Sequence, residues 1–384
     1  MNFKSLLKRL DSNLARVMIP WVLRHPKYLV ASHRLVKSYK TSYALRQQAE
    51  SEGIKVPPFL IFSITSNCNL HCSGCYAASV GTLNSTSENA SKRKEVLNTG
   101  QWSKIISEAV DLGVFGFIIA GGEPFLFSGL LELIEKYKNN FFVIFSNGTA
   151  LKEKHFSRLK KLANVGVIVS VEGGKSLTDN RRGDGAYQKA LDTIIRLNNQ
   201  GTLSGISVTI NKLNYQYWLD PQNIETLISD GIRLGFFMEY IPSTSNNKCA
   251  MEKLFEWDLI NDNDLMLSDE ERKTFREQIL KYRNEKRIIL VHSPGDEELM
   301  GGCVSAGRKF AHVTPTGDLT PCPVSDIATH NLKTSSLKEG LASQLFTLIR
   351  ESEHLLETGD TPCALYAHPT EVEMLVKSVG AYHV

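Results

Sequence analysis

The sequence lacks any run of 18 or more apolar residues, which a helix would need to cross a bilayer. Its N-terminus also lacks the apolar core and the small-residue cleavage site of a secretory signal, so we expect a cytoplasmic protein. No internal repeat or low-complexity tract stands out among the 384 residues, which are 42% hydrophobic and 22% charged. This composition is typical of a globular protein with one large domain and an appendage, or with two domains.

Cysteine is scarce, and its distribution does not fit a disulfide framework. The seven cysteines are an odd number, and three of them, Cys68, Cys72 and Cys75, lie within eight residues. Disulfide-stapled secreted domains carry even numbers of cysteines spread along a short chain. The distribution therefore favours metal ligation in a reducing compartment.

Acidic residues are nearly absent from residues 1–49, which hold ten Lys and Arg against one acid, although the whole chain has a net charge of only +3. Apolar residues recur at helical spacing in the same segment: Leu6, Leu7, Leu10, Leu14 and Val17. Such a helix either contacts an anionic membrane or an acidic partner, or packs as a collar with its basic face in water. We keep peripheral membrane contact through residues 1–40 as an alternative to the collar, and expect no nucleic-acid partner.

Short β-rich apolar runs alternate with helical patterns from residue 58 to about 245. The predicted strands are Phe59–Thr65, Phe115–Ala120, Phe141–Ser146, Val165–Val171, Gly205–Asn211 and Gly235–Ile241. The predicted helices between them cover about 101–113, 127–138, 153–163, 185–200 and 221–232. This alternation predicts a parallel sheet with right-handed crossovers. Because six units are fewer than the eight of a closed TIM barrel, we expect an α/β fold, a partial (β/α)6 TIM-like barrel, with its chemistry at the C-terminal ends of the strands.

The pattern changes after the sixth predicted strand. A charged helix near 268–286 leads into a Gly-, Cys- and Pro-rich region, and helices near 336–350 and 368–379 finish the chain. We therefore predict a helical extension (1–57), the partial barrel (58–290) and a small C-terminal α+β domain (291–384). The polar segment 79–100 has no apolar period and predicts a loop beside the first cysteines.

The run Cys68-Asn-Leu-His-Cys72-Ser-Gly-Cys75-Tyr76 directly follows the first predicted strand. Three thiolates with the spacing C-x3-C-x2-C can ligate three corners of a [4Fe–4S] cubane, which leaves the fourth iron free for a small molecule. S-adenosylmethionine (SAM) can coordinate there through its amino and carboxylate groups. The alternative is a zinc site, with His71 as a fourth ligand.

Polar residues also follow the next three predicted strands. Gly121-Gly122-Glu123-Pro124 comes after the second strand, where glycine permits close approach of the backbone to a ligand. Ser146-Asn147-Gly148-Thr149 ends the third strand, and Ser170-Val171-Glu172-Gly173 ends the fourth. Polar side chains at successive strand ends suit the ribose and carboxylate of a cofactor, which makes zinc a weaker interpretation.

These motifs, in this order and spacing over about residues 58–245, resemble the radical SAM superfamily. The resemblance implies that Cys68, Cys72 and Cys75 ligate a [4Fe–4S] cluster and that Tyr76 lies by the SAM adenine. The other SAM-binding residues that it implies are Gly121, Gly122 and Glu123 at the methionyl amino group, Ser146 and Asn147 on the third strand, and Ser170 and Glu172 at the ribose. Arg181 and Arg182 either grip the SAM carboxylate or are solvated charges near a helix start.

A second set of cysteines lies near the C-terminus. Cys303 and Cys322 flank Gly317, which with Asp318 predicts a hairpin turn that brings the two thiols towards one site, where Cys363 could complete three ligands. The arrangement resembles a SPASM auxiliary-cluster domain in its shortened "twitch" form, which implies one auxiliary [4Fe–4S] cluster. The alternatives are small buried hydrophobes or a zinc site. Candidates for a fourth ligand are Cys249, Asp326 and a histidine such as His330; alternatively, the fourth position stays open for substrate.

Three further residues lie near the expected position of a substrate. Cys249 is a hydrogen-atom donor, the fourth ligand or a residue without a role. Glu239 and Tyr240, at the end of the sixth predicted strand, either touch substrate or are alternating strand residues satisfied by their neighbours.

The resemblance implies an enzyme that takes one electron from a flavodoxin or ferredoxin and cleaves SAM to a 5′-deoxyadenosyl radical. The radical then removes hydrogen from a substrate C–H bond. We expect oxidative modification or cross-linking of a peptide. The alternatives are radical modification of a lipid or small-molecule metabolite at the membrane surface and, in a different class, a non-catalytic metal-binding protein.

Overall fold

The computed structural model describes residues 3–83, 95–242 and 262–384, with side chains from residue 13 onwards. In these residues one curved sheet runs in the order β11-β9-β8-β1-β2-β3-β4-β5-β6-β7. Its parallel strands are β1 (Phe59–Ser63), β2 (Gly116–Ala120), β3 (Phe141–Ser146), β4 (Val165–Ser170), β5 (Leu203–Ile210), β6 (Leu234–Glu239), β7 (Ile289–Ser293) and β8 (Phe310–Val313). The α/β partial-barrel prediction is therefore confirmed.

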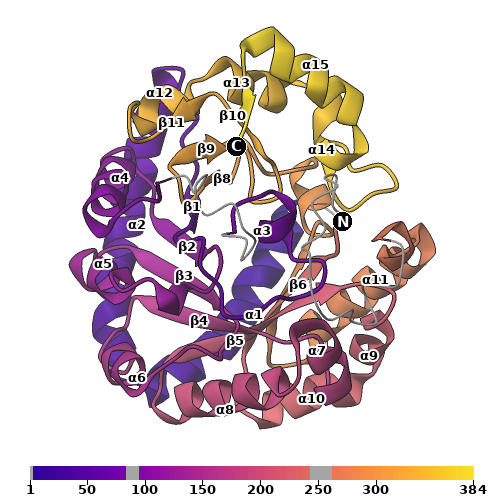
Figure 1. Ribbon diagram of the computed structural model, residues 1–384. Helices are drawn as coiled ribbons and strands as arrows, with labels where there is room; N and C mark the ends of the chain where they lie inside the picture. The colour runs from indigo at the N-terminus through magenta and orange to yellow at the C-terminus, as the bar shows by residue number, and fades with distance from the viewer. Residues whose placement is uncertain (1–2, 84–94, 243–261) are drawn as a thin grey trace.

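Helices cover the outside of the curved sheet, and the short helix α3 (Tyr76–Ser79) lies inside it (Figure 1). The outer helices include α4 (Thr99–Asp111), α5 (Leu130–Lys136), α6 (Glu153–Leu159), α8 (Ala186–Asn199) and α10 (Pro221–Ser229). The rings of Phe62, Phe117 and Phe142 on adjacent strands pack with centroids 5.3 Å apart and are fully buried. Such apolar strands suit a parallel sheet that is covered by helices.

Two parallel strands were not among the six predicted. β7 pairs with β6, with Leu234 opposite Ile289, and β8 pairs with β1, with Phe59 opposite Phe310. The boundary predicted near residue 290 falls inside β7, so the sheet continues through it.

The C-terminal hairpin has the turn that the sequence predicts. β8 is antiparallel to β9 (Asp318–Thr320), with His312 opposite Thr320. Gly317 has a φ of +97°, a conformation that L side chains rarely adopt. Beyond it lie β10 (Ile327–Ala328), β11 (His330–Asn331) and β12 (Tyr382–His383).

Several helices differ from their predicted bounds. α7 (Lys175–Arg182) and α9 (Tyr215–Leu219) were missed because each is short. The helix expected over 336–350 is two helices, α12 (Leu337–Leu341) and α13 (Gln344–Glu351), since the Ser343 side chain caps the second by accepting from the Phe346 amide. α11 (Asp269–Glu285), α14 (Ala364–Ala367) and α15 (Pro369–Val379) complete the described α-helices.

The N-terminal helices α1 (Phe3–Arg24) and α2 (Lys27–Ser51) pack against the barrel. The Tyr28 hydroxyl accepts a hydrogen bond from the Leu203 amide at 3.0 Å, and Arg46 donates to the Gly113 carbonyl at 2.6 Å. These contacts are those of the collar interpretation. Apolar side chains on the outer face, among them Ile19 and Leu23, stay exposed, so membrane contact remains a prediction. Within the described ranges no helix combines the length and apolarity needed to cross a membrane.

Gly113→Ala should destabilise the protein by about 1–3 kcal/mol more than Gly53→Ala. Both glycines have positive φ, +97° and +82°, so both substitutions share the backbone strain. Only a Cβ at residue 113 meets the α2 backbone, at 2.6 Å from the Ser42 carbonyl oxygen, whereas nothing lies within 4 Å at residue 53. Urea unfolding followed by circular dichroism measures the difference, and equal losses would show that α2 is not tightly docked.

Candidate active site

Cys68, Cys72 and Cys75 lie on the loop between β1 and α3, where Cys75 is the residue preceding the helix. None forms a disulfide. Burial raises the pKa of Cys68 to about 12, and the proximity of Cys72 and Cys75 adds to the rise. Burial likewise raises the pKa of Cys72, with Cys75 contributing. The structure therefore gathers the three predicted ligands at the C-terminal end of β1.

Gly121 and Gly122 pack against the backbone of this cysteine loop. The Gly122 amide donates to the Thr65 carbonyl at 2.8 Å, and the Glu123 amide donates to the Asn67 carbonyl at 2.8 Å. A Cβ on Gly122 would lie 2.1 Å from the Asn67 oxygen. The sequence predicts that these glycines approach a ligand, which stays a prediction. The structure shows that they permit a close approach to the loop that carries the cysteines.

Glu123 joins the ends of β2 and β3. Its carboxylate accepts hydrogen bonds from the Phe125 amide (3.0 Å), the Ser146 hydroxyl (2.9 Å) and the Asn147 amide (2.8 Å). Burial raises its pKa to about 7, although these three hydrogen bonds oppose the shift. The Asn147 side chain in turn donates to Asn69 Oδ1 on the cysteine loop at 3.0 Å. Glu123, Ser146 and Asn147 therefore fix the position of one side of the loop.

Glu172 fixes the other side. Its fully buried carboxylate accepts from Arg181 Nη1 at 2.5 Å, from Arg182 Nε at 2.8 Å and from the Thr209 amide at 3.1 Å. Arg181 also donates to the carbonyls of Ser73 and Gly74, between the second and third cysteines. Sequence reasoning treated both arginines as SAM ligands or solvated charges and missed that they are partners of Glu172.

Arg182 remains close to the thiols. Its pKa is raised despite its burial, because Glu172, Cys72 and Cys75 all favour the charged form. A cation beside thiolate ligands stabilises their ionised form. Ser170, the other residue predicted on this strand, shares a hydrogen bond of 2.9 Å with Ser207.

A buried hydrogen-bonded chain runs from the first cysteine loop to the C-terminal hairpin. Tyr76 hydrogen-bonds with Ser63, and Ser63 Oγ lies 2.8 Å from His312 Nε2. His312 Nδ1 lies 2.7 Å from the Thr320 hydroxyl, which donates to the Cys322 carbonyl at 3.1 Å. Burial lowers the pKa of His312 to about 3, so the ring is neutral. The Thr320 hydroxyl donates its proton to the Cys322 carbonyl, so it must accept from His312 Nδ1. The other ring nitrogen, Nε2, then accepts from the Ser63 hydroxyl.

Cys303, Cys322 and Cys363 lie close together at the Cys322 end of this hydrogen-bonded row. Burial raises the pKa of Cys322, and Cys363 and Cys303 add to the rise. Glu297, which the sequence did not single out, further raises the pKa of each of the three thiols. Its own pKa is raised by burial, and it accepts from Ser293 Oγ at 2.6 Å and from the Val304 amide at 3.2 Å. Glu297 could therefore supply a fourth ligand.

The residues predicted as a fourth ligand have other partners or lie outside the described residues. Asp326 pairs with His383 at 2.8 Å, His330 shares a hydrogen bond of 2.9 Å with Thr329, and Cys249 lies outside the described residues. Glu239 pairs with Arg272 on α11 at 2.7 Å and with His292 on β7 at 3.0 Å, so its carboxylate is satisfied by neighbouring residues. The ring of Tyr240 lies against Gly74, beside Cys75.

The spacing of the thiols bears on the choice between an iron–sulfur cubane and a zinc ion at each site. Zn–S bonds of about 2.3 Å bring tetrahedral thiolates within about 3.8 Å of one another. Among the described residues, however, the one set of three or more metal-type ligand atoms drawn within 4.8 Å is His354, His368 and Glu371. Neither cysteine triplet is among such compact sets, and a cubane spreads its ligands over separate iron corners.

Comparison with known proteins agrees with this geometry. Residues 62–220 match the family model described as the radical SAM superfamily. The sporulation killing factor maturation protein SkfB of Bacillus subtilis is 29% identical over 41% of this chain and 37% of its own length. The Fe-coproporphyrin III synthase of Methanosarcina barkeri is 30% identical over 41% of this chain and 38% of its own length. The chain thus spans less than two fifths of the length of these two relatives.

Other relatives match over more of the chain. The PqqA peptide cyclase of Granulibacter bethesdensis is 25% identical over 74% of this chain and 72% of its own length. The crystal structure of Streptococcus suis SuiB bound to S-adenosylmethionine has a TM-score of 0.61 at 18% identity, over 79% of this chain and 70% of that chain. This likeness shows a shared fold. Motif and family model together show that residues 62–220 carry a radical SAM superfamily domain, and the chain shares the fold of SuiB.

Proposed function

We propose that Cys68, Cys72 and Cys75 ligate a [4Fe–4S] cluster with an open iron for SAM, and that the enzyme modifies a peptide. When bound, cluster and SAM supply reductive cleavage of SAM to methionine and a 5′-deoxyadenosyl radical, which removes hydrogen from a substrate C–H bond. The observation that supports the proposal is the gathering of three free thiols at the C-terminal end of β1, inside the matched residues 62–220. A reduced flavodoxin or ferredoxin is the proposed electron donor.

The chain's own residues would hold SAM at the same edge of the sheet. The residues proposed to form the SAM site, by contact or by positioning, are Tyr76, Gly121, Gly122, Glu123, Ser146, Asn147, Ser170, Glu172 and Arg182. The carboxylates of Glu123 and Glu172 already accept protein hydrogen bonds, so we assign them to positioning the loops. Arg182, beside Cys72 and Cys75, is the residue best placed to meet an anionic group of SAM.

A peptide substrate is favoured by relatives whose names specify one. One is the PqqA peptide cyclase, and another is SuiB, which was crystallised with its precursor peptide SuiA. A small molecule or lipid is the second candidate. It is favoured by the Fe-coproporphyrin III synthase and by the exposed apolar side chains on α1 and α2.

The second thiol set would ligate an auxiliary [4Fe–4S] cluster in a SPASM/twitch-like C-terminal part. Cys303, Cys322 and Cys363 supply three thiolates, and we assign the fourth position to the Glu297 carboxylate. Two observations support the assignment. Beyond the effect of burial, Cys303 and Cys363 raise the pKa of Cys322, and the Glu297 carboxylate raises the pKa of all three thiols, so the four groups lie close together. Burial also makes an uncompensated charge there costly.

Anaerobic reconstitution should give about eight irons per chain in the wild type. The Cys68/Cys72/Cys75→Ala variant should retain about four and form no 5′-deoxyadenosine with dithionite and SAM. The Cys303/Cys322/Cys363→Ala variant should also retain about four while still cleaving SAM. Iron analysis and chromatography of 5′-deoxyadenosine measure both quantities. A wild type with about four irons would contradict the auxiliary cluster, whereas SAM cleavage by the first variant would contradict the primary site.

Glu297→Gln should change the electron paramagnetic resonance spectrum of the auxiliary cluster, because the substitution removes an anionic ligand. The measurement is made on dithionite-reduced protein in the Cys68/Cys72/Cys75→Ala background, where the auxiliary cluster alone contributes. Glu298→Gln is the matched control. Glu298 is the next residue in the sequence, and its carboxylate is half-exposed and pairs with Arg276. Identical spectra for the two variants would contradict ligation by Glu297.

The substrate class can be read from hydrogen transfer. Cells that express the protein natively are grown in deuterated medium and separated into a peptide fraction and a lipid and small-metabolite fraction. The enzyme is then incubated with SAM, dithionite and each fraction. Because the radical takes hydrogen from the substrate, we expect deuterium in 5′-deoxyadenosine with the peptide fraction, measured by mass spectrometry. Deuterium transfer from the other fraction alone would reject a peptide substrate.

A further inference from the structure

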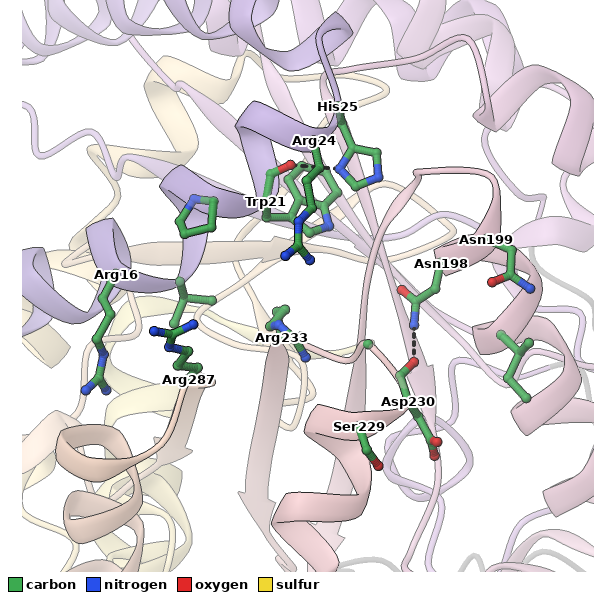
Figure 2. A pocket seen from close by; sticks show the side chains of 14 residues that line it. Arg16, Trp21, Arg24, His25, Asn198, Asn199, Ser229, Asp230, Arg233 and Arg287 are labelled. Carbon is green, nitrogen blue, oxygen red and sulfur yellow. Dashed lines mark hydrogen bonds between the residues drawn. The ribbon is translucent and has the colours of Figure 1, made fainter.

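A pocket of about 530 Å³ lies between α1 and the loops that lead into β6 and β7 (Figure 2). Arg233 immediately precedes β6, and Arg287 lies two residues before β7. The cysteines follow the opposite, C-terminal end of a parallel strand, so this pocket opens at the other edge of the sheet. It therefore does not belong to the SAM site.

Four arginines line the pocket: Arg16, Arg24, Arg233 and Arg287. Figure 2 shows Arg24, Arg233 and Arg287 coming from α1 and from the two strand entries and lying around a common space, whereas the Arg16 side chain points towards the end of α11. Within the described part of the chain, none of the four forms an ion pair with a carboxylate, and the lining acid Asp230 is not paired with them. The pocket thus concentrates positive charge without a protein counter-ion.

The arginines differ in how the protein holds them. Arg16 donates to the carbonyls of Arg283, Asn284 and Lys286, and so ties α1 to the end of α11. Arg233 donates through Nη1 to the carbonyls of Ile228 and Ile232, which fixes its guanidinium at the pocket.

Arg24 and Arg287 are exposed, and within the described ranges their side chains form no hydrogen bond. Their N–H donors therefore face the pocket or solvent. Burial and the proximity of Arg24 and Arg287 lower the pKa of Arg233. The like charges therefore repel one another, and a bound anion would relieve this repulsion.

We propose that this pocket binds a phosphate group carried by a larger molecule. The planar guanidinium groups of Arg24, Arg233 and Arg287 suit bidentate recognition of phosphate oxygens. The volume is that of a small-molecule site and exceeds what one inorganic phosphate fills.

Trp21 gives the pocket an apolar wall, and its ring packs on Tyr28 with centroids 4.4 Å apart. The same chemistry is offered by a lipid headgroup and by a soluble phosphorylated molecule. The exposed Ile19 and Leu23 on α1 lie next in sequence to the lining residues and would contact acyl chains in the first case.

The test uses the reconstituted holoenzyme and an Arg24→Gln/Arg287→Gln variant, whose side chains make no recorded contact that the fold needs. Lys37→Gln/Lys40→Gln is the matched control, because it removes two exposed charges from α2 without touching the pocket. Binding of inorganic pyrophosphate is measured by anaerobic titration calorimetry. Binding to vesicles of phosphatidylglycerol with phosphatidylcholine, or of phosphatidylcholine alone, is measured by co-sedimentation.

The arginine variant should lose affinity by about tenfold or more, and the lysine variant by no more than about twofold. Selective loss of pyrophosphate binding identifies a soluble phosphorylated ligand. Selective loss of binding to anionic vesicles, in a protein that does not bind pyrophosphate, identifies a lipid headgroup. Equal losses in both variants, or no binding of either probe by the wild type, would overturn the proposal. SAM cleavage stays unchanged in every variant, so failure here does not bear on the radical chemistry.

Discussion

The paired charges of Glu172, Arg181 and Arg182 are the interaction on which the cysteine site depends. A carboxylate without exposure needs partners, and removing one partner of such a group costs about 3–5 kcal/mol. Here the partners have second functions. Arg181 continues to the carbonyls between Cys72 and Cys75, and Arg182 faces the thiols themselves. One strand-end acid thus sets both the shape of the ligand loop and the charge around it.

Local signals in the sequence predicted most of the barrel and both cysteine sets. The C-x3-C-x2-C spacing, the glycines after β2 and the turn at Gly317 are each decided within a few residues. The structure has the three cysteines on one loop, the glycines at a tight approach to that loop, and the hairpin turn at Gly317. Contacts between segments that are distant in the sequence could not be predicted from local patterns. No sequence pattern near Phe310 indicates that it pairs with Phe59. Likewise, no pattern near Glu297 indicates that it lies beside Cys303, Cys322 and Cys363. The arginines after β4 were noticed, but their partner could be identified only once α7 had folded back over the strand.

The two cysteine sites are joined by more than proximity. Ser63 on β1, His312 on β8 and Thr320 on β9 form a neutral hydrogen-bonded row across adjacent strands, with Tyr76 at one end and the Cys322 carbonyl at the other. Each member has its protons assigned by its neighbours, so the row resists rotation of any one side chain. The distance between the cysteine sets is therefore held by the sheet and by this row together, which would keep the two proposed clusters at a fixed separation.

The pairing of β8 with β1 has a consequence for biogenesis. The strand that leads into the first cysteine loop is completed on one side by β2, but its other edge stays open until Phe310–Val313 has been made. At about 5–20 residues per second, the roughly 250 intervening residues take on the order of tens of seconds to translate. Throughout that interval an apolar strand edge and three reactive thiols are exposed together, which is a hazard for aggregation and oxidation. A nascent chain of this topology needs a chaperone or an early metal donor more than its finished stability would suggest.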